Sequence, residues 1–433
     1  MTQSFAGMLN TFESTNDLFS FMEPTMKSCS SLLVIAFGII HTLSIPQVAN
    51  AQLSPKDRIL IKLHRYSASL WDDFSINNEE QPIRVRIDSP TPENLRGLVE
   101  EYPMIEEIYF LGPEPNLTEK EFVEICNELA KLQHLIVFDA QLAIAIGDSA
   151  CRSIGKLPQI EKLHLFLGEV SIEGINQLAK LNNLKTLELR VPGRNDDAVA
   201  AAIIRRFPLL TEIHLSGLGI GPQTFEAMGS VESLSILWLK HRIEVDGEAF
   251  AHLLKCHQLQ KLWLRCEVQE DWYDTIGRLN SLKLLDLGRI CADRDLSKLA
   301  SLDQLEVLRI YGGTYSDRSL AKLNRLTQLK QLTLSSENVT GSAFRELSEF
   351  DQLKELRLKH TKFVPENGPY LAELESLEYL DLSWTPLAWS NDWESLVPLA
   401  RLQHLRKIWI DFKDKPAHEL RKRLPGVTIE YYE

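Results

Sequence analysis

The fold is decided by a short pattern that recurs in the middle of the chain. Residues 234–239 read LSILWL, residues 259–264 read LQKLWL and residues 282–287 read LKLLDL. The last three positions of each stretch alternate with period two, which is typical of a short strand. In an earlier copy, residues 172–181 follow the strand with apolar side chains at helical spacing. The chain is therefore expected to alternate strand and helix at a nearly fixed interval.

The pattern L-x-x-L-x-L occurs thirteen times between residues 105 and 410, at intervals of 23 to 30 residues. A period of this length indicates a solenoid, because one strand and one short helix cannot bury their own apolar faces and must stack on neighbouring units. The copies begin at Ile105, Leu135, Ile160, Leu184, Leu210, Leu234, Leu259, Leu282, Leu305, Leu329, Leu353, Leu377 and Leu405.

The pattern resembles the leucine-rich repeat family over about residues 83–433, and units of about 24 residues look most like its short-helix bacterial class. The resemblance implies an α/β horseshoe with parallel strands on the concave face and helices on the convex face. The chain departs from the family at the ninth repeat position, where many members place Asn or Cys. Without that side-chain ladder, each turn must satisfy its backbone in another way. Six copies show the departure, at Gly168, Leu218, Gly313, Glu337, Thr361 and Thr385.

Residues 1–51 are expected to be a signal segment. Residues 30–45 carry no formal charge, Lys27 precedes them, and Ala49-Asn50-Ala51 follows, which are the parts of a secretory signal peptide. The residues before Met26 are acidic, so we interpret Met26 as the true start and place cleavage after Ala51. An uncleaved anchor and a buried helix of a cytoplasmic protein are the alternatives. The apolar stretch is short for a membrane span, and none is expected after cleavage.

Residues 52–104 are expected to form an N-terminal cap with a divergent first unit. Residues 105–433 are expected to form the solenoid of about 13 repeats, with a capping strand at its end. Terminal units of this kind cover the open ends of the core and keep a solenoid soluble. The predicted elements are helix starts at Ser54-Pro55 and Thr91-Pro92 and strands at residues 83–87 and 427–431.

The fifth and seventh positions of each copy are expected on the concave surface, because successive strand residues face opposite sides. Trp238 and Trp263 fall in adjacent fifth positions, and Asp286 is the only acid in these two columns from Trp238 to Lys359. The local balance of +4 contrasts with a net charge of −13 for the chain. Trp, Tyr and Arg often dominate interface energies. The predicted ligand-binding residues are Trp238, Lys240, Trp263, Arg265, Arg309, Tyr311, Arg357 and Lys359.

Such a patch suits an acidic protein segment or an anionic glycan. The alternative is that these side chains only cover the sheet through cation–π contacts between repeats. A second aromatic cluster, at residues 384–393, either caps the core or forms a binding ridge. It consists of Trp384, Trp389 and Trp393. His164 and His214 share the fifth column but lie two repeats apart, roughly 10 Å by strand spacing, and we interpret them as isolated surface histidines.

Five cysteines follow the predicted signal segment. Four of them replace apolar residues of the repeat and are expected to be buried, namely Cys126, Cys151, Cys256 and Cys291. Cys266 alone is expected at an exposed position. The sequence has no C-x-x-C motif, and a disulfide framework is not expected.

The sequence contains no H-E-x-x-H, G-x-S-x-G, P-loop or EF-hand motif. Residues 217–221, GLGIG, look like a dinucleotide loop, but they lack its last glycine and fall at an ordinary repeat turn. We therefore predict a non-enzymatic interaction module without cofactor or metal, and the acidic balance disfavours nucleic acid as a partner. It is expected to be secreted, periplasmic or in the cell envelope. The alternative is a cytoplasmic adaptor or effector-like protein that docks a partner through residues 52–104.

Overall fold

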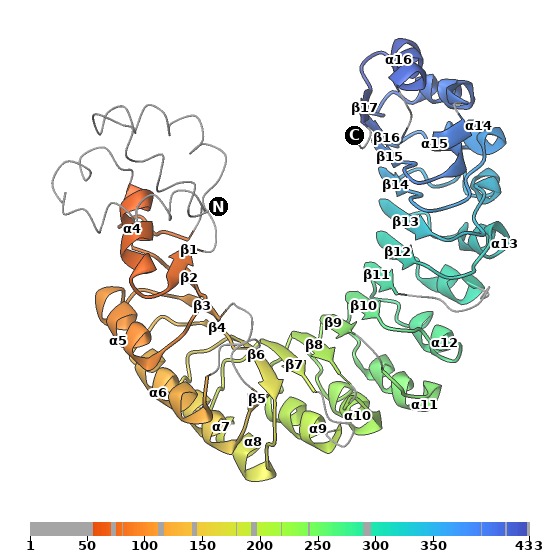
Figure 1. Cartoon of the computed structure of the whole chain (residues 1–433). Coiled ribbons are helices and arrows are strands. Elements are labelled where there is room, and N and C mark those ends of the chain that lie inside the picture. The colour runs from red at the N-terminus through yellow and green to blue at the C-terminus, as the bar shows by residue number, and fades with distance from the viewer. Residues whose placement is uncertain are drawn as a thin grey trace, which may run out of the picture.

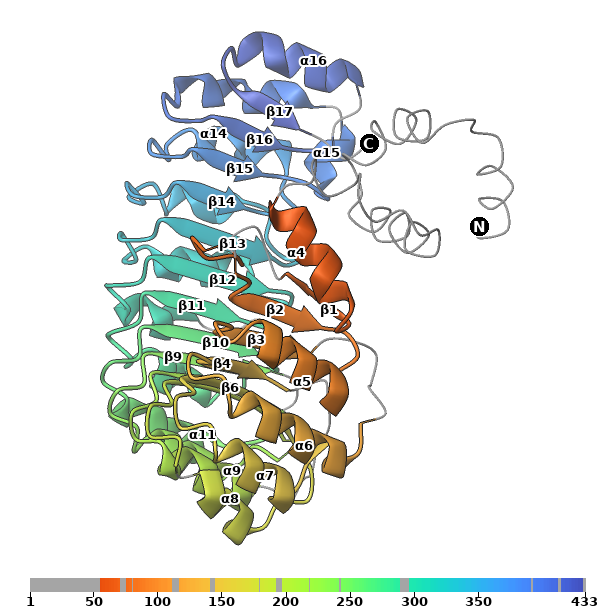
Figure 2. The same ribbon diagram turned by 90° about the vertical axis from the view of Figure 1, so that its left-hand side faces the viewer.

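The computed structural model is an open horseshoe in which strands line the concave surface and helices form the convex layer (Figure 1). This confirms the α/β solenoid that the repeats predict. Viewed from the side, the strands stack as a ladder (Figure 2). The predicted signal segment lies outside the described residues. These are residues 55–70, 75–79, 81–110, 117–140, 145–178, 180–191, 197–217, 219–240, 243–288, 296–390, 392–411 and 414–430.

The described strands form one 17-stranded sheet. Neighbouring strands run parallel, except that β1 and β2 pair antiparallel at the N-terminal end. Both β4 and the short β5 pair with β6. The strands are β1 (Ala68–Leu70), β2 (Arg84–Ile87), β3 (Glu107–Phe110), β4 (Val137–Asp139), β5 (Ala145–Ile146), β6 (Lys162–Leu167), β7 (Thr186–Arg190), β8 (Glu212–Ser216), β9 (Ile236–Lys240), β10 (Lys261–Arg265), β11 (Leu284–Leu287), β12 (Val307–Tyr311), β13 (Gln331–Ser335), β14 (Glu355–Arg357), β15 (Tyr379–Asp381), β16 (Lys407–Trp409) and β17 (Thr428–Glu430).

The strands are in register, so equivalent repeat positions lie side by side. Trp263 on β10 lies opposite Trp238 on β9 and opposite Asp286 on β11. On either side of Trp263, Leu262 and Leu264 are fully buried. Burying one leucine contributes about 1.5–3 kcal/mol, and a slip by one residue would turn every leucine outward. The buried leucines therefore fix the register, and the concave side chains are free to vary.

The convex layer changes along the chain. Earlier repeats carry α-helices such as α6 (Glu119–Leu129) and α9 (Asp197–Arg206), whereas later repeats carry short 3-10 segments such as η3 (Leu296–Ser301) and η5 (Ser342–Arg345). The later units, from Leu259 to Leu377, repeat every 23 or 24 residues, which leaves less chain for a helix. A 3-10 helix rises further per residue and spans the same gap with fewer residues.

The other helices follow the same division, with longer α-helices in the first part of the chain, except that the C-terminal α16 is again a ten-residue α-helix. They are α4 (Pro55–His64), α5 (Pro92–Glu101), α7 (Asp148–Ile154), α8 (Ile172–Leu178), α10 (Pro222–Met228), α11 (Gly247–Phe250), η2 (Ala251–Lys255), α12 (Trp272–Ile276), α13 (Asp317–Leu320), η4 (Ala321–Leu323), η6 (Pro365–Asn367), α14 (Gly368–Leu371), α15 (Pro386–Ser390), η7 (Trp393–Arg401) and α16 (Asp414–Arg423).

Aspartates and threonines satisfy turn backbone groups in place of an asparagine ladder. The Asp197 carboxylate accepts hydrogen bonds from the backbone N–H groups of Gly221 and Thr224 in the next repeat, at 3.0 and 2.8 Å. Asp317 does the same for Gly341. The Thr361 hydroxyl donates to the carbonyl of Leu358. The aspartate contacts provide partners for backbone N–H groups at the starts of the next units, whereas the Thr361 hydroxyl adds a second hydrogen bond to a carbonyl that already accepts from the Thr361 N–H.

Several predicted helix starts and strand positions are confirmed. Thr91 caps α5 by accepting from the N–H of Asn94, and Thr118 and Glu121 form a capping box on α6. β2 and β17 fall on the predicted alternating stretches. The predicted N-cap Ser54 lies outside the described residues. The helix that follows it, α4, begins at Pro55. Gly217, at the start of the GLGIG stretch, has φ of 118° and sits against the Val191 carbonyl, which fits a tight turn.

One cysteine prediction is wrong. Cys266, expected to be exposed, is 6% exposed, because the chain turns inward after β10 and the thiol joins the apolar core. Burial raises the pKa of its thiol to about 12, so it is an unreactive side chain rather than a surface nucleophile. Cys126, Cys151 and Cys256 are buried and free, as expected. Cys291 lies outside the described residues.

The aromatic cluster near the C-terminus is split. Trp393 is partly buried against the core, whereas Trp384 and Trp389 are 47% and 65% exposed. Trp384 has a φ of 58°, and its backbone N–H donates to the Asp411 carboxylate at 2.6 Å. Trp393 therefore contributes to the core, and the other two rings project from it. Among the described helices, none has the length and apolar character needed to span a bilayer.

Candidate functional site on the concave face

The two central tryptophans lie where the repeat predicts them. The rings of Trp238 and Trp263 stack with centroids 5.6 Å apart and planes inclined by 25°. The Lys240 ammonium lies 4.4 Å from the Trp238 ring centroid, and the Arg265 guanidinium lies 4.5 Å from that of Tyr311. The indole N–H of Trp238 has no hydrogen-bond partner. Aromatic faces and cations thus form one continuous surface across β9 to β12.

Asp286 lies beneath this surface. Its side chain is 0% exposed, and its carboxylate meets Arg265 at 2.9 Å and Arg309 at 3.9 Å. Arg265 reaches across β11 to Tyr311 on β12, and this crossing covers the carboxylate. Burial raises the pKa of Asp286, and the two guanidinium groups oppose that rise. One buried acid is therefore shared by two arginines.

Two of the predicted binding residues, Arg357 and Lys359, lie outside the surface on β9 to β12. Arg357 lies on β14, four strands from Trp263 on β10, which is roughly 19 Å at the usual strand spacing. It pairs with Glu355 on its own strand and covers the Tyr379 ring at 5.2 Å. Lys359 follows in the same repeat. We call the remaining six residues the aromatic–cation surface: Trp238, Lys240, Trp263, Arg265, Arg309 and Tyr311.

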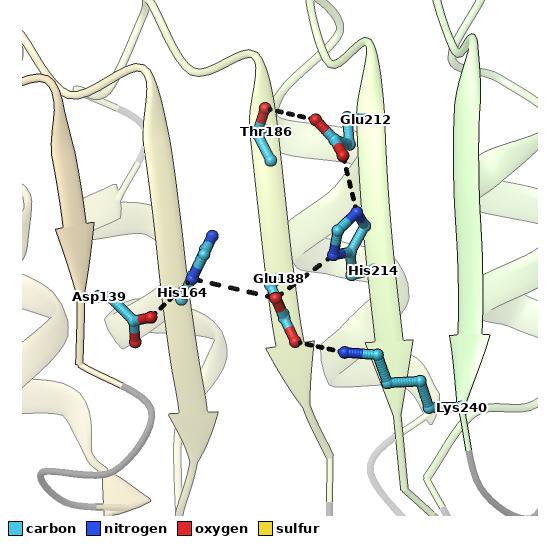
Figure 3. A network of polar contacts seen from close by, with 7 residues as sticks. All are labelled: Asp139, His164, Thr186, Glu188, Glu212, His214 and Lys240. Atoms are coloured by element: carbon cyan, nitrogen blue, oxygen red, sulfur yellow. Dashed lines mark hydrogen bonds and ion pairs between the residues drawn. The ribbon is translucent and has the colours of Figure 1, made fainter. Parts of the chain in front are cut away.

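A second group of side chains, on β4 to β8, forms a chain of polar contacts (Figure 3). We call it the histidine–carboxylate network, and it consists of Asp139, His164, Glu188, Glu212 and His214. His164 Nδ1 lies 3.0 Å from Asp139 and 3.9 Å from Glu188. His214 Nδ1 lies 3.3 Å from Glu188, and its Nε2 lies 2.8 Å from Glu212. The interpretation of His164 and His214 as isolated surface histidines is therefore wrong.

The two carboxylates around His214 determine its protonation. Burial lowers the pKa of His214, but the hydrogen bonds to Glu188 and Glu212 outweigh it, and the net pKa is raised above the ordinary histidine value. The hydrogen bond from His214 lowers the pKa of Glu212, against the effect of burial. Both shifts favour the charged form of each group, an imidazolium and a carboxylate.

A signal for this network is present in the sequence: four of its residues follow one another in the fifth column, and Glu212 occupies a third position. The third repeat position shares the concave face with the fifth and seventh, since all three differ by two residues. Glu212 and Glu355 occupy third positions, and Glu188 lies in the fifth column directly between the two histidines. Reading all three columns together would place both histidines among carboxylates.

Lys240 connects the two groups. Its ammonium pairs with Glu188 at 3.1 Å and lies over Trp238. The His214 ring also meets the Trp238 ring edge-on at 5.2 Å. The histidine–carboxylate network therefore contacts the aromatic–cation surface at both Lys240 and Trp238.

Comparison with known proteins supports the fold. No family model and no curated protein matches the chain, whereas solved structures do. An internalin from Listeria monocytogenes is 16% identical, with a TM-score of 0.42 over 78% of this chain and 88% of its own. A leucine-rich repeat protein of Leptospira interrogans is 18% identical, with a TM-score of 0.48 over 86% and 97%. TLR13, solved in complex with ssRNA13, is 15% identical, with a TM-score of 0.51 over 80% and 56%. The chain has a leucine-rich repeat fold.

A leucine-rich repeat fold presents its strand side chains as a broad surface and not as a closed pocket. In the described ranges, no group of three or more His, Cys, Asp or Glu side chains is arranged to hold a metal ion. The described cysteines are buried, so none offers a thiolate at the surface. The concave face presents stacked rings, cations and a titratable network.

Proposed function

We propose that this leucine-rich repeat protein is a binding module without catalytic chemistry, and that its concave face takes an acidic segment of a partner protein. The proposal is carried by the stacked pair of Trp238 and Trp263, with Lys240 and Arg265 held beside it. Large rigid rings supply contact area at low conformational cost, and such side chains often dominate binding energies.

The charge around the rings favours an acidic partner. Arg265 and Arg309 share the single carboxylate of Asp286, which leaves one positive charge without a matching acid among the described residues. Arg265 is held on both sides, by Asp286 and by the Tyr311 ring, so little side-chain freedom is lost when it binds. An ordered guanidinium group can donate two parallel hydrogen bonds to one carboxylate.

Panning a displayed library of short random peptides on the full chain, alongside an array of anionic glycans, tests this function. Peptides that combine acidic and aromatic residues are expected to bind. The double variant Trp238→Ala/Trp263→Ala is expected to weaken them at least about 100-fold, because two hot-spot rings are lost. Trp389→Ala is the matched control, since this ring is exposed outside the surface. Unchanged affinity of the double variant, or capture of glycans alone, contradicts the proposal.

We also propose that the protein acts outside the cytoplasm. Support comes from the uncharged residues 30–45 and the Ala-Asn-Ala sequence that follows them. N-terminal sequencing and fractionation of the protein from its own host check this. A chain that starts at Gln52 outside the cytoplasm is the expected result, whereas an intact cytosolic chain favours an adaptor docking through residues 52–104.

A further inference from the structure

His214 is the one described histidine whose two ring nitrogens both face carboxylates. Nε2 lies 2.8 Å from Glu212 on its own strand, and Nδ1 lies 3.3 Å from Glu188 on β7. An ionised carboxylate only accepts hydrogen bonds, and a neutral imidazole has one donor and one acceptor. A neutral His214 would direct a nitrogen lone pair at a carboxylate oxygen. The observed arrangement therefore needs both ring nitrogens to be protonated.

We propose that the concave face binds a proton at His214, and that this proton maintains the Trp238 surface in the state that accepts an acidic ligand. The identity of the ligand rests on the function proposed above, whereas the uptake of the proton does not. The site is built from β7, β8 and β9, three adjacent strands of the sheet.

The groups around His214 on each neighbouring strand account for this coupling. On β7, Glu188 faces the ring and also meets His164 and Lys240. On β8, Glu212 faces the ring and accepts from the Thr186 hydroxyl of β7 at 3.2 Å. On β9, the Trp238 ring meets His214 and carries Lys240 over its face. The two carboxylates raise the pKa of His214 despite burial, so the proton is held more tightly than by an ordinary histidine.

Loss of the proton changes this surface in two ways. One of the two carboxylate contacts must open, because only one ring nitrogen still donates. One positive charge also disappears next to Trp238, where Glu188 and Glu212 remain ionised. Both changes lower the affinity for an acidic ligand as pH rises through the folded-state pKa of His214.

The first test uses the full chain without ligand. Histidine ring signals followed by NMR from pH 5 to 9.5 are expected to show His214 titrating above the ordinary histidine value of about 6.5. Glu188→Gln and Glu212→Gln are each expected to lower the His214 midpoint. The indole N–H signal of Trp238, assigned with Trp238→Phe, is expected to shift with the same midpoint. A His214 midpoint at or below about 6.5, or a Trp238 signal that does not follow the His214 midpoint, overturns the proposal.

The second test uses an acidic peptide selected by panning. Its affinity is expected to fall about fivefold between pH 6 and pH 9, the size expected for one charge at close range in a solvated site. In His214→Gln, the amide offers one donor group and one acceptor group but does not titrate. The affinity of this variant is therefore expected to stay constant over that range. If no acidic peptide binds, the proposed function fails while the titration still decides the proton site. A fall of equal size in His214→Gln overturns the link between proton and ligand.

Discussion

The histidine–carboxylate network and the aromatic–cation surface are neighbours on one sheet, yet they present opposite chemistry. Both rest on the same floor of buried leucines, for example Leu163 under the first and Leu262 under the second. Both also follow the same strand register. The leucine ladder fixes where each side chain stands, and the outward positions decide what it does. A solenoid can therefore change its surface from one repeat to the next without changing its fold.

The two regions also differ in how they hold their titratable groups. In the network, carboxylate contacts raise the pKa of His214, so the protonated form is the charged and stabilised one. In the aromatic–cation surface, burial raises the pKa of Asp286 and favours its neutral form, while Arg265 and Arg309 oppose this effect. The same direction of shift thus has opposite causes, namely favourable pairing in one region and desolvation in the other.

The largest loss of stability is expected at the buried leucines, which the two regions share. Leu163→Ala and Leu262→Ala each remove a fully buried side chain from the shared floor. Each is expected to lower the free energy of unfolding by about 2–5 kcal/mol, through lost burial and the cavity that remains. Urea unfolding of both variants measures this. If either substitution lowers the free energy of unfolding by less than about 1 kcal/mol, the buried leucines do not support the two regions equally, which contradicts the comparison.

An intermediate effect is expected from Glu188→Gln, which removes the carboxylate shared by His214 and Lys240. We expect a loss of about 1–2 kcal/mol at pH 6, in line with hydrogen bonds between charged groups. The loss should shrink toward pH 9. A raised histidine pKa contributes stability that is fully present below its unfolded-state pKa and is lost as pH rises through the folded-state pKa. Unfolding curves at the two pH values measure the difference.

Asp286→Asn provides the contrasting variant. A buried acid with a raised pKa makes the folded state less stable as pH rises from the ordinary aspartate pKa, about 3.9, through the folded-state pKa. Asp286→Asn removes that dependence, so it should alter the pH profile on the acidic side, from about pH 3.9 up to the folded-state pKa of Asp286. The fall in stability between pH 6 and 9 that is assigned to His214 should persist in Asp286→Asn. Its loss in Asp286→Asn, and not in Glu188→Gln, would reverse the roles of the two regions.

The sequence predicts the shared floor much better than the two surfaces. Period-two alternation around the leucines places Trp238 beside Trp263 and Asp286 beside Arg309, and the strand register confirms both. The spacing of the leucines alone predicts which side chains lie side by side on neighbouring strands, because each leucine must enter the core. The turn contacts of Asp197 and Asp317 could not be read in this way, since they join residues of different repeats through loop geometry.

Side-chain reach explains most of what the sequence analysis missed. Arg265 crosses a whole strand to reach Tyr311 and thereby buries Asp286, which no column of repeat positions can show. Cys266 follows β10 at a position that varies between repeats, so its burial depends on where the chain turns. The histidine contacts, in contrast, could have been found, because Glu188 stands between His164 and His214 in one column.

The smallest effect is expected at the link between the regions. Lys240→Met removes the ammonium that pairs with Glu188 while keeping an apolar chain against Trp238. This ion pair is only partly exposed, and pairs at the surface contribute about 0–1 kcal/mol, so the free energy of unfolding should change by no more than about 1 kcal/mol. The pKa of His214 should nevertheless rise, because Glu188 loses its competing cation and a nearby positive charge disappears.

NMR titration of His214 in Lys240→Met measures this shift, with Lys330→Met as the control because that lysine pairs with Glu306 on a distant part of the sheet. A rise in Lys240→Met alone would show that the network and the aromatic–cation surface share charge through one lysine. Equal midpoints in all three proteins would mean that the two regions titrate independently, since Glu188 is the only carboxylate that Lys240 pairs with among the described ion pairs. The pH response would then have to pass through the contact between the His214 and Trp238 rings.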